Sequence, residues 1–314
     1  MKPPKLHKKD ILQITDLSKK EMYDLFEFSA KLKKAQKAGK VTHILKNKTL
    51  AMIFEKNSTR TRVSFEVGMY QLGGSALFLS RNEIQLGRGE TFPDTAKVLS
   101  RYVDGIMIRT DAHNKVIEIA NDATVPVING LTDFEHPCQA LTDFFTMYER
   151  NCKLEKQKLV YIGDGNNVAN SLLLGSAILG IDVSIVSPKE YFPDSKVVKK
   201  AEDIAKSSGA AIVVTSDVAS SVVNADYLYT DVWISMGQED EAAKRREVFA
   251  DFKISSELLK KCPSHCKVMH CLPAYRGDEI DSDVMDSDSS IVFDQAENRL
   301  HLQKGLLCAL MGQS

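Results

Sequence analysis

The sequence predicts an α/β protein made of two similar doubly wound domains, each with a parallel sheet flanked by helices. Strand-like and helix-like segments alternate along almost all of the 314 residues, as they do in parallel α/β folds. The strand-like segments are apolar on both faces, which is typical of strands covered by helices on each side. A polar stretch at 150–158 separates two sets of about five strand candidates. Because such folds bind ligands at the carboxyl ends of their strands, we expect an active site in the cleft between the two domains.

The first domain is predicted over residues 1–150. Its first helix should be opened by a capping box, in which Ser18 and Glu21 exchange hydrogen bonds, and should run to about Gly39. Strands are expected at 50–54, 75–79, 105–108 and 125–128. The clearest helical patterns lie at 91–102 and 137–149.

The second domain is predicted over residues 151–295. Strands are expected at 159–162, 183–186, 211–214, 227–230, 267–269 and 291–293. The clearest helical patterns lie at 168–180 and 194–208. A final helix over 296–311 follows the last strand, and residues 296–314 are expected to pack back on the first domain.

Composition excludes several classes of protein. Hydrophobic residues make up 43% and charged residues 26% of the chain, as in a globular protein. A net charge of −1 gives no overall field that would attract nucleic acid or anionic lipid. The longest apolar stretch, 172–179, is too short to span a bilayer. The basic first residues are not followed by the apolar segment of a signal peptide, so none is expected. Six cysteines in a chain of this length do not form a disulfide framework. We therefore expect a cytoplasmic protein without a membrane or nucleic-acid partner.

The most informative motif is Ser-Thr-Arg-Thr-Arg at 58–62, between a predicted strand and a predicted helix that is established by Val63. Ser58 or Thr59 is a natural N-cap. The N-terminus of a helix attracts anions through its unpaired N–H groups and its dipole, and two arginines add to this attraction. We therefore expect a phosphate site. The alternative is a solvated helix face on which the arginines pair with acidic neighbours. No P-loop motif occurs, so a nucleoside triphosphate is not implied.

Two other motifs suggest a cofactor or a metal, but neither fits well. The turn at 163–168, Gly-Asp-Gly-Asn-Asn-Val, resembles a dinucleotide-binding turn, yet Val168 occupies the position of its third glycine. Cys262, His265, Cys266 and the pair at 270–271 could bind zinc, but the Cys-x₂-Cys spacing of structural zinc sites is absent. We expect neither a cofactor nor a metal.

Taken together, the motifs resemble those of the aspartate/ornithine carbamoyltransferase family over about 6–311. Ser-Thr-Arg-Thr-Arg is similar to the carbamoyl phosphate signature of that family, and His-Pro-Cys-Gln at 136–139 is similar to its His-Pro-x-Gln motif. Ser-Met-Gly at 235–237 and His-Cys-Leu-Pro at 270–273 resemble motifs of its ornithine-specific members. Members specific for aspartate recognise a dicarboxylate with arginines, and no arginine lies at 231–238.

The resemblance implies a role for each matched residue. Carbamoyl phosphate is expected to contact Ser58, Thr59, Arg60, Thr61, Gln85, Arg109, His136, Gln139, Cys271, Leu272 and Arg299. Ornithine is expected to contact Asn167, Asp231, Ser235 and Met236. Catalytic roles are expected for Arg109, His136, Asp231, Cys271 and Arg299. In some relatives the loop that matches Gln85 comes from a neighbouring subunit, so the resemblance also implies a trimer or a multiple of trimers.

The implied reaction joins carbamoyl phosphate and L-ornithine to give L-citrulline and phosphate, in arginine biosynthesis or the arginine deiminase pathway. The first domain would then bind carbamoyl phosphate and the second would bind ornithine. Transfer to another amine, such as putrescine or an N-acylated ornithine, is one alternative. A non-catalytic relative that binds only phosphate or an amino acid is another, although it would not need Arg60, His136, Asp231 and Cys271 together.

Overall fold

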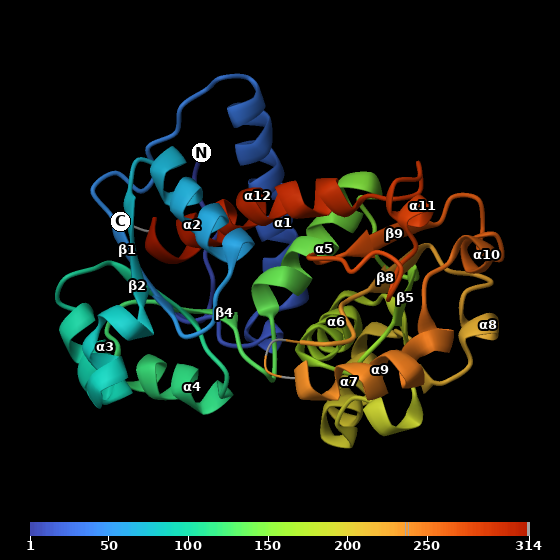
Figure 1. Ribbon diagram of the computed structural model, residues 1–314. Helices are drawn as coiled ribbons and strands as arrows, with labels where there is room; N and C mark the ends of the chain where they lie inside the picture. The colour runs from blue at the N-terminus through green and yellow to red at the C-terminus, as the bar shows by residue number, and fades with distance from the viewer. Residues whose placement is uncertain (236, 238, 313–314) are drawn as a thin grey trace. The chain divides into compact units, whose positions relative to one another are not determined.

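The computed structural model describes residues 1–235, 237 and 239–312, and it divides into two compact units. Unit 1 comprises Met1–Arg150 and Glu297–Ser314, and unit 2 comprises Asn151–Ala296. Each unit contains one parallel sheet with helices packed against it (Figure 1). The prediction of an α/β fold with two parallel-sheet domains is therefore confirmed.

Unit 1 is built on a four-stranded parallel sheet with the order β2-β1-β3-β4. Its strands are β1 (Thr49–Phe54), β2 (Ser75–Ser80), β3 (Gly105–Arg109) and β4 (Val127–Leu131). Its helices are α1 (Lys19–Lys37), α2 (Thr59–Gln71), α3 (Phe92–Leu99), α4 (His113–Asp122), α5 (Pro137–Arg150) and most of α12 (Val292–Met311). Because the chain goes from β1 to the edge strand β2 and then to β3 on the other side, the sheet has a switch point between β1 and β3.

The helices of unit 1 cover both faces of its sheet (Figure 1). On one face, α3 and α4 pack on alternate residues of β1 and β3, such as Ile53 and Ile108. On the other face, α12 packs closely against α1 and α2. A β-carbon added to Gly305 of α12 would lie 2.1 Å from the hydroxyl of Ser29 in α1, so only glycine permits this approach. The C-terminal helix thus belongs to the core of unit 1.

Unit 2 is built on a five-stranded parallel sheet with the order β7-β6-β5-β8-β9. Its strands are β5 (Lys158–Ile162), β6 (Asp182–Val186), β7 (Ile212–Thr215), β8 (Tyr227–Thr230) and β9 (Lys267–His270). Its helices are α6 (Asn167–Leu179), α7 (Ser195–Ser208), α8 (Val218–Ser221), α9 (Ala242–Phe249), α10 (Ser256–Leu259) and α11 (Ser282–Met285). The chain goes outward from β5 to β7 and returns to β8, so this sheet has its switch point between β5 and β8.

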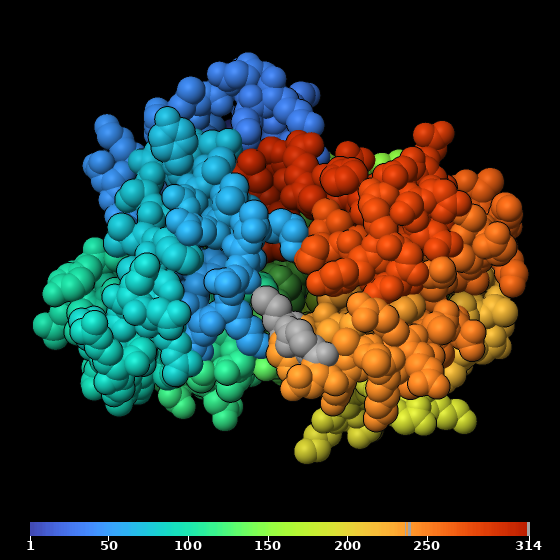
Figure 2. Space-filling view, viewed as in Figure 1, coloured from blue at the N-terminus to red at the C-terminus, as the bar shows by residue number. Residues whose placement is uncertain are grey.

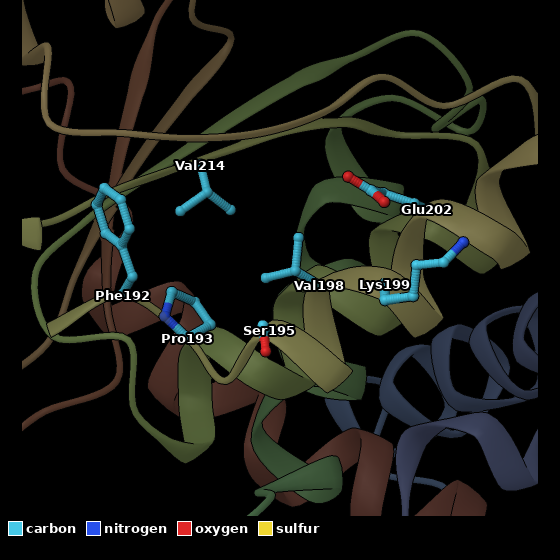
Figure 3. Close-up of a pocket in the computed structure, with 7 residues that line it drawn as sticks. All are labelled: Phe192, Pro193, Ser195, Val198, Lys199, Glu202 and Val214. Carbon is cyan, nitrogen blue, oxygen red and sulfur yellow. The ribbon is translucent and has the colours of Figure 1, made fainter.

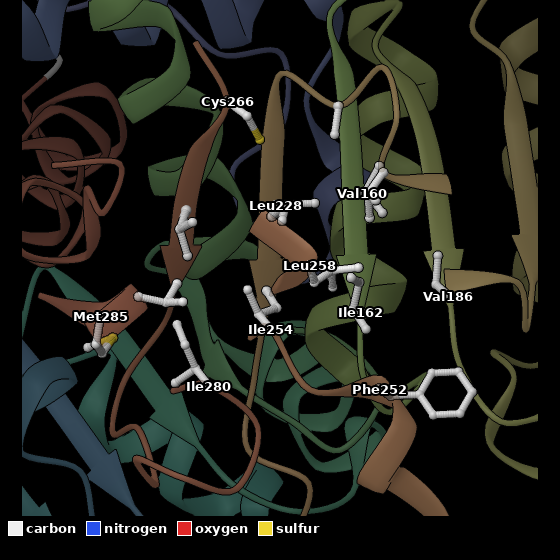
Figure 4. Close-up of a cluster of buried hydrophobic side chains, with 14 of the residues drawn as sticks. Val160, Ile162, Val186, Leu228, Phe252, Ile254, Leu258, Cys266, Ile280 and Met285 are labelled. Atoms are coloured by element: carbon white, nitrogen blue, oxygen red, sulfur yellow. The ribbon is translucent and has the colours of Figure 1, made fainter. Parts of the chain in front are cut away.

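One face of the unit 2 sheet packs on a cluster of buried apolar side chains (Figure 4). Val160 and Leu228 come from the central strands, whereas Ile254, Leu258 and Ile280 come from the segments that follow β8 and β9. Burial of these side chains holds the later segments of unit 2 against its sheet.

Two sequence predictions differ from the structure. The strand predicted at 291–293 does not form, because pairing with β9 stops at a single bridge between Val268 and Ser290. Helix α12 begins at once, and the N–H of Gln295 already donates to the carbonyl of Ile291 at 2.9 Å. Helix α3 ends at Leu99 rather than at 102, where the chain tightens into turns in which Tyr102 N–H donates to the carbonyl of Leu99.

Unit 2 has a cavity on its surface. A cavity of about 440 Å³ lies beside α7 and is lined by Phe192, Pro193, Ser195, Val198, Lys199, Glu202 and Val214 (Figure 3). None of the residues predicted to bind substrate lines it. Among the described helices, none has both the length and the apolar character needed to cross a membrane.

Candidate functional site

The candidate site of unit 1 forms at the switch point of its sheet. Phe54, the last residue of β1, pairs in register with Arg109, the last residue of β3. The turn that follows β1 and the side chain that ends β3 therefore emerge side by side. This is the position at which open parallel sheets bind their ligands.

Helix α2 presents its N-terminus at this switch point. Ser58 is its N-cap, and the Ser58 hydroxyl accepts a hydrogen bond from the backbone N–H of Thr61 at 3.3 Å. The helix begins at Thr59, so Thr59, Arg60 and Thr61 form its first turn. Thr61 is buried, Arg60 is half-buried and Thr59 is exposed. The first turn thus combines helix N–H groups, hydroxyls and a guanidinium, which are the groups that bind phosphate.

Strand β4 leads into His136 and Gln139, which are 5% and 2% exposed. Pro137 is the first residue of α5, as predicted, and it places Gln139 in the first turn. The side-chain amide of Gln139 donates to a carboxylate oxygen of Asp143 at 2.8 Å. Because a carboxylate accepts and an amide N–H donates, this bond fixes the orientation of Gln139 and turns its oxygen toward other donors.

Arg299 of α12 is one of those donors. Its Nη1 donates to the side-chain oxygen of Gln139 at 2.6 Å, and its Nη2 donates to the hydroxyl of Thr61 at 3.1 Å. Arg299 is 3% exposed, so these bonds form away from bulk water. Three predicted site residues from α2, α5 and α12 are thus joined in one hydrogen-bonded group.

Three guanidiniums lie near His136. Burial lowers the pKa of His136 well below its ordinary value, and the guanidiniums of Arg299, Arg109 and Arg60 lower this pKa further. His136 is therefore neutral at neutral pH and offers an N–H donor without adding a charge. A site with three nearby guanidiniums and a neutral imidazole suits an anion that carries a carbonyl or phosphoryl oxygen.

Gln85 lies apart from this group. It is exposed at the start of the short helix η3 (Gln85–Arg88), and its side chain makes no hydrogen bond to the described residues of the unit 1 site. The preceding helix η2 (Arg81–Glu83) is anchored because Arg81 pairs with Glu55 at 2.8 Å. The predicted role of Gln85 therefore stays a prediction.

The candidate site of unit 2 forms at the switch point of the second sheet. Asp231 directly follows β8 and is 7% exposed. One of its carboxylate oxygens accepts from the thiol of Cys271 at 2.9 Å, and the other accepts from the amide of Asn166 at 3.3 Å. Asn166 is the N-cap of α6, which follows β5 and begins with Asn167. The structure therefore brings Asp231 and Cys271 together, with Asn167 beginning the adjacent helix.

Asn166 was not among the predicted site residues, which included only its neighbour Asn167. The signal was available, because an asparagine just before a helical pattern is a preferred N-cap. The Asn166 side-chain oxygen accepts from the N–H groups of Val168 and Ala169, which leaves its NH₂ to reach Asp231.

A buried pair of side chains supports the turn that holds Cys271 and Leu272. His270 Nδ1 accepts from the N–H of Leu272 at 2.8 Å, so the proton lies on Nε2, which faces Glu279 at 3.0 Å. Glu279 also accepts from the N–H of Tyr275 at 2.6 Å. Leu272 has a φ of 58°, an uncommon conformation for a branched residue. The His270–Glu279 pair thus stabilises a turn that sequence reasoning could not describe.

The loop after Asp231 is held by Arg245 of α9. Nη1 of Arg245 donates to the carboxylate of Asp164 at 2.8 Å and to the backbone carbonyl of Trp233 at 3.0 Å. Its guanidinium also lies over the ring of Tyr191, 4.9 Å from the ring centre. The predicted residue Ser235 follows two residues after Trp233. Met236, also predicted, lies outside the described residues.

The acidic groups of unit 2 gather around Tyr161. Burial raises the pKa of the Tyr161 hydroxyl well above its ordinary value, and Asp231, Asp164, Cys271 and Glu279 raise it further. The site of unit 2 is therefore negative where the site of unit 1 is positive. Such surroundings suit a cationic ligand.

One group of side chains in the described chain has the spacing of a metal site. Ligand atoms of Asp231, His270 and Cys271 lie within 4.8 Å of one another. However, the free lone pair of His270 accepts from Leu272 N–H, so a metal would have to displace that bond. The other residues considered for zinc, Cys262, His265 and Cys266, belong to no such group in the described residues, and His265 pairs with Asp226 at 2.8 Å.

Comparison with known families identifies both halves of the chain. Residues 9–149 match the carbamoyl-P binding domain of aspartate/ornithine carbamoyltransferases, and residues 155–310 match the Asp/Orn binding domain. The chain belongs to the aspartate/ornithine carbamoyltransferase family. The family predicted from the motifs is therefore confirmed.

Individual relatives match over nearly the full chain. The ornithine carbamoyltransferase of Anoxybacillus flavithermus is 54% identical over 96% of this chain and 96% of its own length. The anabolic ornithine carbamoyltransferase of Pyrococcus furiosus is 51% identical over 97% and 96%. A solved structure of ornithine carbamoyltransferase from Pyrococcus furiosus has a TM-score of 0.96 and 50% identity, and covers 99% of each chain. A Giardia lamblia ornithine transcarbamoylase has a TM-score of 0.87 at 32% identity, covering 97% of this chain and 98% of its own.

Proposed function

We propose that this protein transfers the carbamoyl group of carbamoyl phosphate to the δ-amine of L-ornithine, giving L-citrulline and phosphate. The observation that carries the proposal is the opposite charge of the two switch-point sites in a chain of this family. Arg60, Arg109 and Arg299 suit a phosphate dianion, whereas Asp231 suits an ammonium. An aspartate substrate would instead bring two carboxylates to the acidic site, which like-charge repulsion disfavours.

In unit 1, the first turn of α2 is proposed to bind the phosphate. Ser58, Thr59, Arg60 and Thr61 supply backbone and side-chain donors there. Arg109 and neutral His136 are proposed to donate to the carbonyl oxygen, which becomes more negative as the amine attacks. Gln139 can accept from the carbamoyl NH₂ through the second lone pair of its oxygen, since Arg299 occupies the first.

In unit 2, Asp231 and Cys271 are proposed to orient the side-chain nitrogen of ornithine. An alkyl ammonium has a pKa of roughly 10, so it must first lose a proton to solvent water before the nitrogen can attack. The neutral amine then forms a bond to the carbamoyl carbon as the bond to the phosphate oxygen breaks. One N–H proton is lost, and the phosphate can take it up. Asn167, Ser235 and Met236 are proposed to bind the amino acid group, and Leu272 to contact carbamoyl phosphate through its carbonyl.

We further propose that the protein assembles as a trimer, or a multiple of trimers, in which Gln85 serves a neighbouring active site. Support comes from large apolar side chains exposed on α2 and the edge strand β2: Val63 at 50%, Tyr70 at 81% and Leu77 at 48%. The α2 and β2 segments, in light blue and cyan, form part of the visible surface in Figure 2. Exposed apolar groups of this kind are typical of subunit contacts. Sedimentation of a fully active monomer would contradict this assembly.

A cytoplasmic location is proposed on the state of the cysteines. None of the six forms a disulfide in the described structure, and one of them, Cys152, is exposed. Free thiols persist in reducing compartments.

Product analysis tests the proposed reaction. The purified protein is incubated with carbamoyl phosphate labelled on carbon and with ornithine, putrescine, N-acetylornithine or aspartate in separate reactions. We expect labelled citrulline as the dominant product. A dominant product from another amine would identify one of the alternative carbamoyltransferases, and no product from any amine would favour a non-catalytic relative.

A further inference from the structure

Gln303 is a fully buried polar residue of α12 to which no role has been assigned. It lies one helical turn after Arg299 and is 0% exposed. Its side-chain oxygen accepts from Nε of Arg299 at 2.9 Å, and its side-chain NH₂ donates to the hydroxyl of Ser64 at 2.8 Å. Both ends of the amide are thus used inside the site of unit 1.

The direction of these hydrogen bonds is fixed by chemistry. A guanidinium has only donors, so the oxygen of Gln303 must face Arg299 and its NH₂ must face Ser64. The Ser64 hydroxyl in turn donates to the backbone carbonyl of Arg60 at 2.6 Å. One directed chain therefore links Arg299 to the backbone of the helix turn that is proposed to hold the phosphate.

With this chain, each of the three nitrogens of the Arg299 guanidinium has a hydrogen-bond acceptor. Nη1 and Nη2 donate to Gln139 and Thr61, while Nε donates to Gln303. The three acceptors come from α5, α2 and α12. Because they bond to all three nitrogens, they fix both the position of the guanidinium plane and its rotation.

We propose that Gln303 is a positioning residue for carbamoyl transfer, which holds Arg299 in the orientation that the reacting carbamoyl group requires. This inference rests on the proposed function, because it assigns Arg299 to the carbamoyl phosphate site. Gln303 bonds to Arg299 and Ser64, and the proposed effect on the reaction passes through these two residues. A neutral residue suits this task because a carboxylate there would reduce the positive charge that attracts the phosphate.

Two substitutions separate the positioning effect from the charge effect. Gln303→Met keeps the approximate volume but removes the amide, so Arg299 loses a strong acceptor and Ser64 loses a donor. Gln303→Glu keeps an oxygen that can accept from Arg299 but adds a negative charge. We expect Gln303→Met to lower kcat by about 10- to 100-fold, and Gln303→Glu to raise the Kd for carbamoyl phosphate about tenfold with kcat at saturation within about threefold.

Lys304→Met provides a matched control on the neighbouring residue of the same helix. Lys304 is 2% exposed, and its ammonium donates to Gln36 at 2.7 Å and Gln71 at 2.9 Å, outside the site. This substitution perturbs the packing of α12 without removing a contact of Arg299. We expect its melting temperature to fall while its kcat and its KM for both substrates stay within about twofold of wild type.

The experiment measures kcat, both KM values, the Kd for carbamoyl phosphate by calorimetry and the melting temperature for the wild type and the three variants. The inference is supported if Gln303→Met loses kcat, Gln303→Glu mainly loses carbamoyl phosphate affinity and Lys304→Met loses neither. It is overturned if Gln303→Met keeps kcat within twofold, if Gln303→Glu loses kcat as severely as Gln303→Met, or if Lys304→Met loses kcat equally. An inactive wild type would overturn the proposed function together with this inference, whereas an active wild type with an unaffected Gln303→Met variant would overturn the inference alone.

Discussion

The two candidate sites occupy equivalent places in similar sheets but carry opposite charges. In unit 1, Arg109 ends β3 beside the switch point, and Arg299 and Arg60 lie close enough to depress the pKa of His136. In unit 2, Asp231 follows β8 beside the switch point, together with the thiol of Cys271. The parallel sheet therefore determines where a ligand binds, and a few side chains at the strand ends determine which charge it carries.

The buried histidines show the same contrast. Burial lowers the pKa of His136 well below its ordinary value, and the neighbouring guanidiniums lower it further. His270 instead faces the carboxylate of Glu279 at 3.0 Å and accepts from a backbone N–H. The first histidine is proposed to donate to a ligand, whereas the second supports a turn. Identical residue types thus take different roles because their charged neighbours differ.

The largest effect on this contrast is expected from Asp231→Asn, which removes the charge of the acidic site. Loss of a charged contact of about 2–5 kcal/mol should lower kcat/KM for ornithine by roughly 30- to several-thousand-fold. The Kd for carbamoyl phosphate should change by less than about twofold, because the variant leaves unit 1 untouched. Steady-state kinetics and calorimetry check both values, and an equal loss of both ligands would show that the two sites do not divide the substrates by charge.

Cys271→Ser should have the next largest effect. The hydroxyl is smaller and less acidic than the thiol that donates to Asp231 at 2.9 Å. We expect kcat/KM for ornithine to fall by about 5- to 150-fold, which corresponds to about 1–3 kcal/mol. Carbamoyl phosphate affinity and the melting temperature should be retained. Loss of a stoichiometric metal from this variant, measured by elemental analysis beside the wild type, would instead assign Asp231, His270 and Cys271 to a metal site.

Arg245→Met sharpens the comparison within unit 2, because Arg246 offers a matched control. Arg245 is buried and joins Asp164 to the backbone of Trp233, whereas Arg246 is half-exposed and pairs with Asp278. Freeing the loop should raise the KM for ornithine about tenfold. Arg246→Met should leave it within about twofold. If both variants have the same KM, Arg245 does not position this loop.

The last effect concerns stability in acid rather than substrate use, and it is confined to unit 1. Burial lowers the pKa of His301 from 6.5 to about 4, against the opposing effect of Glu297 at 3.0 Å. Between pH 6.5 and 4 the unfolded chain binds a proton that the folded chain does not. The free energy of unfolding should therefore fall as the pH decreases, by at most about 1.4 kcal/mol per pH unit. His301→Gln should lose this part of the slope in urea denaturation, and an unchanged slope would contradict it.

Much of the fold was predictable because parallel sheets leave a strong signal. Apolar runs such as the one that forms β1 gave strand positions, and Pro137 gave the first residue of α5. The segment at 291–293 was mistaken for a strand because a short apolar run is compatible with either structure. Whether this segment formed a strand depended on its pairing with β9, and that pairing is limited to one bridge between Val268 and Ser290. That contact is long-range, so local pattern could not decide it.

The candidate site was predictable where a motif carries the chemistry locally. Ser58 could be named as a cap, and Asp231 could be placed at a strand end. Arg245, Glu279 and Gln303 were missed because their partners are distant in sequence and nothing in their own neighbourhood marks them. Arg245 donates to Trp233, Glu279 accepts from the turn that follows His270, and Gln303 accepts from Arg299. Only these hydrogen bonds show their importance. Local motifs thus nominate candidate ligand-binding groups more readily than the groups that hold them in place.

The division of the substrates between a basic and an acidic site is tested most directly by calorimetric titration of carbamoyl phosphate into the wild type, Arg60→Ala and Asp231→Asn. The account predicts that Arg60→Ala weakens binding by roughly 30- to several-thousand-fold, because a guanidinium is lost from a phosphate site. It predicts that Asp231→Asn binds within about twofold of wild type. Less than threefold weakening in Arg60→Ala, or a comparable loss in Asp231→Asn, would contradict it.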